Sequence, residues 1–492
     1  MNKLLVPVGV ALLALAGVCR AGPALASQNP VPSRPTMDLD VARRDAGRAV
    51  DLTLADAIYM GLQDNRAIRT AYLGRISQRF DLAVSEDRFT PKLILSGRFL
   101  SQRSDQQRWR TLEVVPVATM TSPIGTRVNL AWTGLLNKSG LAPDERNANL
   151  NLTIVQPLLR DAGWEVGMAP VRLGRLIEES NRLNLKSQLS RIVTQIIYAY
   201  RELIRAQEQV TISRESLDRS RKLLDINRGL VASGRMAEFD VVQTEADVLT
   251  QEVNVEEALN QLDQRRMDLV RLLALDLTTP LHAMESLEPS AVNIDLAGAK
   301  RIAVTNQPDY LIQQIASKQA EINLAVARNQ RLWDVSLVSG AARQTQRQGP
   351  AADRQWNGYV GIQLEVPIGD MSRQQGEVHA KTALQSQALQ LEESRQQLEQ
   401  NVTNAVRDIE TRWRQFGLSQ RARDLSLKKI EIEREKLTLG RSSNFQVISF
   451  EADLRNAENA RLNALLAYLN AQVELDLQLG LTLESWKISL ND

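Results

Sequence analysis

The chain has 492 residues, with 60 Lys and Arg against 58 Asp and Glu, which gives a formal net charge of +2. Balanced charge does not favour nucleic-acid binding, which needs a basic surplus concentrated on one face, so we expect no nucleic-acid partner. The single cysteine, Cys19, excludes an intramolecular disulfide as a source of stability.

Residues 1–26 have the pattern of a secretory signal peptide. Lys3 precedes an apolar run, and a small-residue motif ending at Ala26 predicts cleavage before Ser27. The run is shorter than the about 20 residues that span a membrane comfortably, so we expect its removal. Lipidation of Cys19, inside this signal, is an alternative that the bulky Val18 disfavours. Residues 27–50 contain three prolines and predict an extended or mobile leader.

The remainder follows one pattern twice, over residues 51–285 and 286–492, with a proline-marked linker between the copies. Each copy is expected to begin with a helical stretch, which in the first copy runs from Asp51 to near Pro91 and in the second starts at Asp295. Strands follow at about 91–156 and 334–366. Each copy then ends in a long helical hairpin.

Four short segments alternate between apolar and polar residues, which is the period of a strand. They lie at residues 93–101, 149–154, 335–343 and 356–366. Segments of this kind are typical of a transmembrane barrel with an apolar lipid face and a polar lumen, although soluble sheets alternate as well. Five of the seven tryptophans lie in or beside these segments, as in an interfacial girdle or an ordinary sheet. The stretch 102–148 is either an external loop or an added hairpin.

The tips of the two helical hairpins are predicted near residues 229–240 and 437–446. Gly234-Arg235 and Gly440-Arg441 open two segments in which a phenylalanine, a valine and Glu-Ala-Asp recur in register. Each glycine is expected to adopt a left-handed conformation that ends one helix before the next begins. The limbs carry apolar residues three and four apart on otherwise polar helices, which predicts coiled-coil packing.

Chemistry-bearing motifs are few. The two histidines, His282 and His379, are isolated, and we find no metal-ligand spacing, phosphate-binding loop or nucleophile elbow. We therefore expect no catalytic residue, no cofactor, no metal and no enzyme activity. Four strands are too few to close a barrel, so several chains must contribute to one.

The sequence resembles the outer-membrane efflux protein family, the TolC-like channels. Three stretches and the two tips carry the resemblance, which extends over nearly all of the mature chain: 52–54 (Leu-Thr-Leu), 156–159 (Gln-Pro-Leu-Leu) and 366–369 (Val-Pro-Ile-Gly). It implies a mixed α and β fold in which a trimeric, twelve-stranded transmembrane β-barrel is continued by a periplasmic α-helical coiled-coil barrel.

The resemblance also implies partners and a location. The protein would be a homotrimer in the outer membrane of a Gram-negative cell, with its helical part in the periplasm. It would contact outer-membrane lipid, a periplasmic adaptor (membrane fusion) protein, and through it an inner-membrane pump or ABC-type transporter. Substrates for efflux or type I secretion would pass without chemical change. The alternative is a periplasmic coiled-coil adaptor or scaffold that does not span a membrane.

The same resemblance suggests site residues at the tips. In the family, acidic rings just after the second tip constrict the entrance, but here the matching residues are Gln446 and Ser449, which are uncharged. Asp240, after the first tip, keeps a carboxylate and is the candidate for a weaker acidic ring. Helix capping is the alternative role for these three residues.

Gly234, Arg235, Gly440 and Arg441 are predicted to form the tip turns and the adaptor docking site. The two arginines either pair with acidic groups of neighbouring chains or face solvent.

Overall fold

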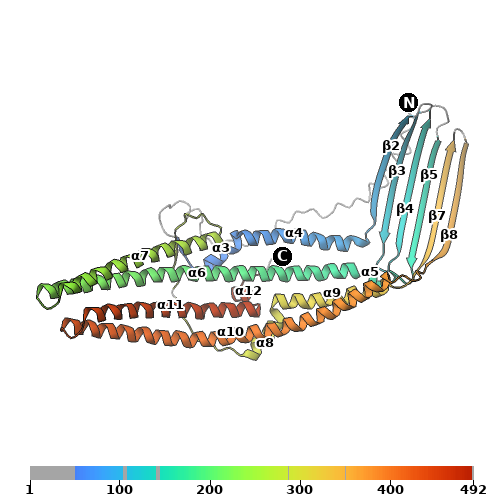
Figure 1. Cartoon of the computed structure of the whole chain (residues 1–492). Coiled ribbons are helices and arrows are strands. Elements are labelled where there is room, and N and C mark those ends of the chain that lie inside the picture. Colours follow the sequence, from blue (N-terminus) through green and yellow to red (C-terminus); the bar gives the residue numbers. More distant parts are fainter. Residues whose placement is uncertain (1–49, 104–107, 140–144, 286, 349–350, 490–492) are drawn as a thin grey trace. The chain divides into compact units, whose positions relative to one another are not determined.

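The computed structural model describes residues 50–103, 108–139, 145–285, 287–348 and 351–489 (Figure 1). The described residues from Asp51 onward form one compact unit. The predicted signal peptide with its cleavage site at Ala26 and Ser27, the cysteine Cys19 and the leader up to residue 49 lie outside the described residues.

The first helical stretch consists of two helices, where the sequence predicted one. They are α3 (Leu54–Asp64) and α4 (Arg66–Glu86), followed by the 3₁₀ turn η1 (Asp87–Phe89). Asn65 separates them because its side-chain oxygen accepts hydrogen bonds from the backbone N–H groups of Ala67 and Ile68 and so caps α4. Its amide nitrogen donates to the Leu272 carbonyl at 2.8 Å, which fixes this break against a distant helix end.

A short strand precedes α3 and corrects the predicted helix start. β1 (Val50–Leu52) pairs with β6 (Leu281–Ala283), so the start of the first copy and the linker between the copies share a two-stranded sheet. Helix α3 begins at Leu54, three residues after the predicted start at Asp51, and Thr53 and Asp56 form a capping box there.

The second half repeats the broken helix. α8 (Leu296–Asn306) and α9 (Pro308–Gln330) are separated by Gln307, whose side-chain oxygen accepts from the Tyr310 N–H at 2.7 Å. Asn329, near the end of α9, contacts the loop that follows the first set of strands. Its Oδ1 accepts a hydrogen bond from the Asp161 N–H at 2.7 Å.

The main sheet has six antiparallel strands in the order β2-β3-β4-β5-β7-β8 (Figure 1). Their bounds are β2 (Lys92–Arg103), β3 (Arg108–Thr121), β4 (Arg127–Ser139), β5 (Glu145–Pro157), β7 (Asp334–Gln348) and β8 (Ala351–Glu365). The prediction of four strands was wrong by two. Most of the stretch 102–148 forms the hairpin β3–β4, which is the second of the two alternatives left open for it.

Two long helical hairpins contain most of the other described residues. The first pairs α6 (Ala169–Ala232) with α7 (Glu238–Leu272), and the second pairs α10 (Ser372–Thr438) with α11 (Asn444–Leu479). At about 1.5 Å per residue, the 64 residues of α6 extend roughly 95 Å. Two short helices, α5 (Trp164–Gly167) and α12 (Thr482–Ser485), complete the described helices.

The apolar stripes predicted on the limbs are buried between helices. Val402, Val406 and Ile409 of α10 pack with Leu465 and Tyr468 of α11 in one cluster. On α6 the stripe around Val193 to Ile204 is buried as predicted. The apolar stripes are therefore buried between helices as predicted, and the coiled-coil geometry of the limbs stays a prediction.

Candidate functional site: the two hairpin tips

Both tip turns have the same hydrogen-bonded geometry. Gly234 and Gly440 take φ values of +69° and +73°. After α6 the Arg235 N–H donates to the Leu230 carbonyl at 2.8 Å, and after α10 the Arg441 N–H donates to the Lys436 carbonyl at 2.8 Å. These are Schellman motifs, in which glycine takes the left-handed position without a Cβ penalty. The predicted conformation of the two glycines is confirmed.

The returning helices α7 and α11 do not use Asp240, Gln446 or Ser449 as their N-cap residues. Ala237 is the N-cap of α7 and supplies no side-chain hydrogen bond, whereas Ser443 is the N-cap of α11 and accepts from the Gln446 N–H at 3.3 Å. None of Asp240, Gln446 and Ser449 is therefore an N-cap, and that alternative is wrong.

The side chains of Asp240, Gln446 and Ser449 differ in their exposure. Gln446 and Ser449 are exposed, and Asp240 is partly buried in the first turn of α7. A carboxylate there is stabilised by the helix dipole. Among the described residues, no donor contacts the Asp240 carboxylate.

A buried polar cluster joins the two tips. Asn227 of α6 is fully buried, and its amide nitrogen donates to Thr244 Oγ1 of α7 at 2.8 Å and to Asn444 Oδ1 of α11 at 2.7 Å. Asn444 in turn donates to the Asp240 carbonyl at 3.1 Å. The position of Asp240 is therefore tied to the first residue of the opposite returning helix.

A second polar contact between the tips involves Arg235. Its guanidinium donates to the Thr438 carbonyl at 3.4 Å, one of the carbonyls left free at the C-terminus of α10. Arg441 is exposed. Thus Arg235 lies against the other tip of its own chain, which neither of the two predicted roles anticipated.

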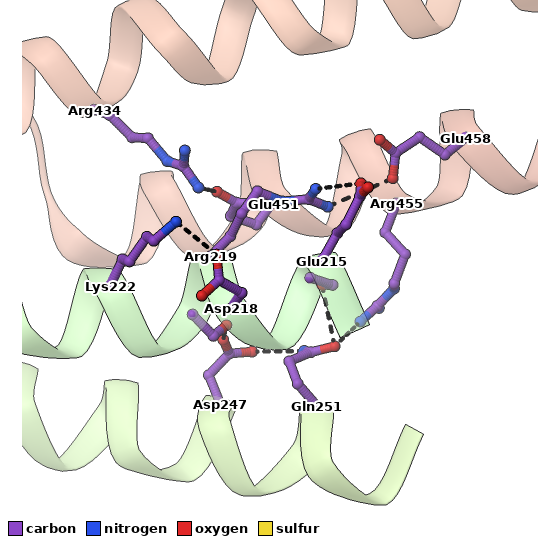
Figure 2. Close-up of polar contacts among 12 residues, drawn as sticks. Glu215, Asp218, Arg219, Lys222, Asp247, Gln251, Arg434, Glu451, Arg455 and Glu458 are labelled. Atoms are coloured by element: carbon purple, nitrogen blue, oxygen red, sulfur yellow. Dashed lines mark hydrogen bonds and ion pairs between the residues drawn. The ribbon is translucent and has the colours of Figure 1, made fainter. Parts of the chain in front are cut away.

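Further along the hairpins, an ion-pair network connects α6 to α11 (Figure 2). Arg219 Nε lies 3.0 Å from Glu451 Oε2, and Arg219 Nη2 lies 3.5 Å from Glu458 Oε2. Arg434 of α10 contacts the other oxygen of Glu451. Burial raises the pKa of the Glu458 carboxyl, and the nearby Arg219 opposes that shift.

Gln251 of α7 provides another link between the hairpins in the same region (Figure 2). Arg455 of α11 donates to Gln251 Oε1 at 2.6 Å, and Ser216 of α6 donates to the same oxygen at 3.4 Å. The Gln251 amide donates to Asp247 at 3.1 Å. Three helices therefore meet through one amide side chain that is only 5% exposed.

Near the second tip, Glu433 has its own partners. Ser442 Oγ donates to Glu433 Oε1 at 2.6 Å, and Lys436 Nζ donates to Oε2 at 3.1 Å. Both contacts favour the ionised carboxylate, so the Ser442 hydrogen bond, followed by that of Lys436, lowers the pKa of Glu433 from its usual 4.5.

Arg219, Gln251, Asn227 and Asn444 are not among the site residues predicted from the sequence. One signal was present: the α6 stripe continues past Val210 in small polar residues, Ser213, Ser216 and Ser220, all buried. A stripe that turns from large apolar to small polar residues indicates close helix packing with buried hydrogen bonds.

Among the described residues, no group of three or more His, Cys, Asp or Glu could hold a metal ion. His282 pairs with Asp51 at 3.2 Å, where both side chains are more than half exposed. None of the described helices is both long enough and apolar enough to cross a membrane.

No protein-family model and no curated protein matches the sequence. Solved structures do match. The outer membrane protein VceC of Vibrio cholerae is 14% identical with a TM-score of 0.67, over 87% of this chain and 96% of that chain. The outer membrane channel CmeC of Campylobacter jejuni is 14% identical with a TM-score of 0.67, over 93% and 90%.

The open state of the outer membrane channel MtrE of Neisseria gonorrhoeae is 16% identical with a TM-score of 0.63, over 87% of this chain and 88% of that chain. At these identities the similarity establishes the fold. The chain has the fold of the TolC-like outer-membrane efflux channels.

Proposed function

We propose that this protein is the outer-membrane channel subunit of an efflux or type I secretion system, through which substrates leave without chemical change. The observation that carries the proposal is the fold, which is shared with outer membrane channels over about nine-tenths of the chain. We infer that function rests on the shape of the assembly, in which a six-stranded sheet is joined to two long helical hairpins.

We propose that the protein is a homotrimer in the outer membrane of a Gram-negative cell. The sheets close into one barrel, and the hairpins form a coiled-coil tube in the periplasm. One face of the sheet supports contact with lipid: Val360, Ile362 and Leu364 of β8 are 77%, 71% and 62% exposed in the single chain. An apolar surface of this kind needs a non-aqueous neighbour.

The tips are the proposed entrance and docking end. In the trimer, Asp240 contributes one ring of three carboxylates. Gln446 and Ser449 are uncharged and add no acidic ring, so the negative charge at the entrance is weaker than acidic residues at those positions would give. Gly234, Arg235, Gly440 and Arg441 form the surface offered to a periplasmic adaptor, which connects to an inner-membrane pump or ABC-type transporter. Phe239 and Phe445, 74% and 69% exposed at equivalent positions, add the aromatic surface typical of protein interfaces.

The alternative, a periplasmic scaffold without a membrane span, accounts for the helices but not for the sheet. A water-soluble sheet buries its apolar face against another layer. The β8 face described above has no such covering layer among the described residues, which favours the channel.

Single-channel recording in planar bilayers tests the proposal, comparing the wild type with Asp240→Asn and Gln446→Asp. We expect discrete conductance steps, weaker cation selectivity in Asp240→Asn, and stronger cation selectivity in Gln446→Asp. Steps without any change in either variant would retain the channel and reject the gate residues. A protein that stays in water without detergent and never inserts would reject the channel in favour of the scaffold.

A further inference from the structure

The hairpin β3–β4 adds two strands to those that each chain contributes to the main sheet. β2 pairs with β3 from Lys92↔Thr119 to Arg103↔Arg108, and β4 pairs with β5 from Arg127↔Val155 to Asn137↔Glu145. The hairpin therefore separates β2 from β5 along their whole length. It is part of the ladder and cannot be described as an external loop.

Both faces of the sheet continue across the inserted hairpin. One row of paired residues, from β2 to β8, is Leu93, Ala118, Leu130, Leu152, Ala341 and Gly358, and the next row on the opposite face is Lys92, Thr119, Asn129, Thr153, Gly340 and Tyr359. Because side chains alternate between faces, the hairpin in these two rows presents Ala118 and Leu130 on the apolar face and Thr119 and Asn129 on the opposite face.

The hairpin strands are also long enough to cross a membrane. β3 has 14 residues and β4 has 13. A tilted transmembrane strand needs only about 9–11 residues. Leu112, Met120, Leu130 and Trp132 on the apolar face are each about 40% exposed in the single chain, like Leu150 on β5. The hairpin and its neighbours thus suit the same environment.

We propose that the membrane wall of this protein has eighteen strands, six from each of three copies, in place of the twelve that four strands per copy would give. This inference rests on the proposed trimeric channel. The occupant of each open sheet edge is a second copy of this chain. With an even number of antiparallel strands per copy, β8 of one chain runs antiparallel to β2 of the next, so the ring closes without a mismatched pair.

The consequence is a wider exit. Strands about 4.8 Å apart and tilted by about 40° give a backbone diameter of about 36 Å for eighteen strands and about 24 Å for twelve. Barrels of 16 to 18 strands leave an aqueous channel. The substrates that such an exit suits are bulky ones, such as a polypeptide or a large amphiphile, provided that the tips open far enough to admit them.

Thiol labelling of the full-length protein in liposomes tests whether β4 lies in the wall. Cys19 lies in the predicted signal peptide, so each introduced cysteine would be the only thiol of the mature protein. The test pair is Asn129→Cys and Leu130→Cys on β4. The matched control pair is Asn151→Cys and Leu150→Cys on β5, where Leu150 and Leu130 are both 41% exposed.

We expect a membrane-impermeant maleimide to label each asparagine site at least about tenfold faster than its leucine partner, because only the polar face meets water. Equal, fast labelling at residues 129 and 130 with alternation kept at 150 and 151 would overturn the inference while leaving the channel intact. Loss of alternation at both pairs would overturn the proposed channel as well.

Cryo-electron microscopy of the wild type in nanodiscs counts the strands directly. We expect a threefold ring of eighteen. A threefold ring of twelve with β3 and β4 outside the wall, or a twofold ring of twelve built from two copies, would each reject the proposal. Deleting residues 108–139 keeps the antiparallel relation of β2 and β5, and the ring of this variant should contain twelve strands.

Discussion

Arg219 and Glu451 join the two helical hairpins through a buried ion pair, with Arg219 Nε 3.0 Å from Glu451 Oε2. Their side chains are 16% and 8% exposed. The equivalent carboxylate of the first tip, Glu245, pairs with Arg228 at 2.7 Å, but these side chains are 46% and 56% exposed and belong to one hairpin. The two copies of the tip therefore place the same glutamate in different environments.

Glu451→Gln should destabilise the helical part far more than Glu245→Gln. Glu451→Gln takes a carboxylate away from Arg219 and Arg434 and leaves Arg219 with its longer contact to Glu458 at 3.5 Å, which should cost about 2 kcal/mol. An exposed pair is worth at most about 1 kcal/mol. Thermal melting of the two variants in detergent, followed by circular dichroism, compares them directly. Equal melting temperatures would show that the contacts of Glu451 with Arg219 and Arg434 do not stabilise the protein.

Gly440→Ala should destabilise the second tip, because a left-handed conformation costs a residue with a Cβ about 1–2 kcal/mol. No atom lies within 4 Å of the added Cβ, so the effect would come from the φ of +73° alone. Gly417→Ala within α10 is the matched control, and it should stabilise its helix by up to about 1 kcal/mol. Chemical denaturation measures both. A stabilising Gly440→Ala would contradict the tip geometry.

Acidification should loosen the second tip through Glu433. The hydrogen bond from Ser442 lowers the pKa of Glu433 below its usual 4.5. The contribution of this carboxylate is therefore present above that value and is lost as the pH falls through the lower pKa of the folded state. Hydrogen exchange of the 441–444 amides, corrected for intrinsic rates, should show protection falling below pH 4.5. Ser442→Ala should weaken that pH dependence, because only the Lys436 contact then favours the carboxylate, and an unchanged profile would reject the assignment.

Asn444→Ala should loosen both tips, whereas Ser443→Ala should loosen only the second. Asn444 is buried and bonds to Asn227 and to the Asp240 carbonyl, so truncation leaves polar groups unpaired at a cost of about 1–3 kcal/mol. Ser443 caps α11 alone, and its loss costs about 1 kcal/mol. Hydrogen exchange across residues 237–244 distinguishes the two. Protection there that survives in Asn444→Ala would mean that the tips are held independently.

Elements specified by local signals could be predicted closely. The tips follow from Gly234 and Gly440, because a C-terminal glycine acts through its own backbone. The tips are predicted near residues 229–240 and 437–446, and the returning helices begin inside these ranges, at Glu238 and Asn444. Strand β8 follows from strict alternation.

Strand β3 escaped prediction because its sequence does not alternate. Residues 114–118 read Val-Val-Pro-Val-Ala, and a proline within a run argues against an inner strand. The structure accommodates Pro116 where the pairing of β3 with β4 is interrupted, between Val114↔Gly134 and Val117↔Ala131. A proline there removes no hydrogen bond from that ladder, and only the position of the neighbouring strand shows this.

By itself, the sequence determined the long helices, their turns and the alternating strands, because each depends on residues close together in the chain. Tertiary structure decided the rest: six strands in the sheet, the break at Asn65 against Leu272, and the meeting of Arg219 with Glu451. The last two features depend on how residues more than 200 positions apart are brought together. A charged residue on a helix has the same local pattern whether it faces water or a buried partner, and only the packed neighbour distinguishes the two.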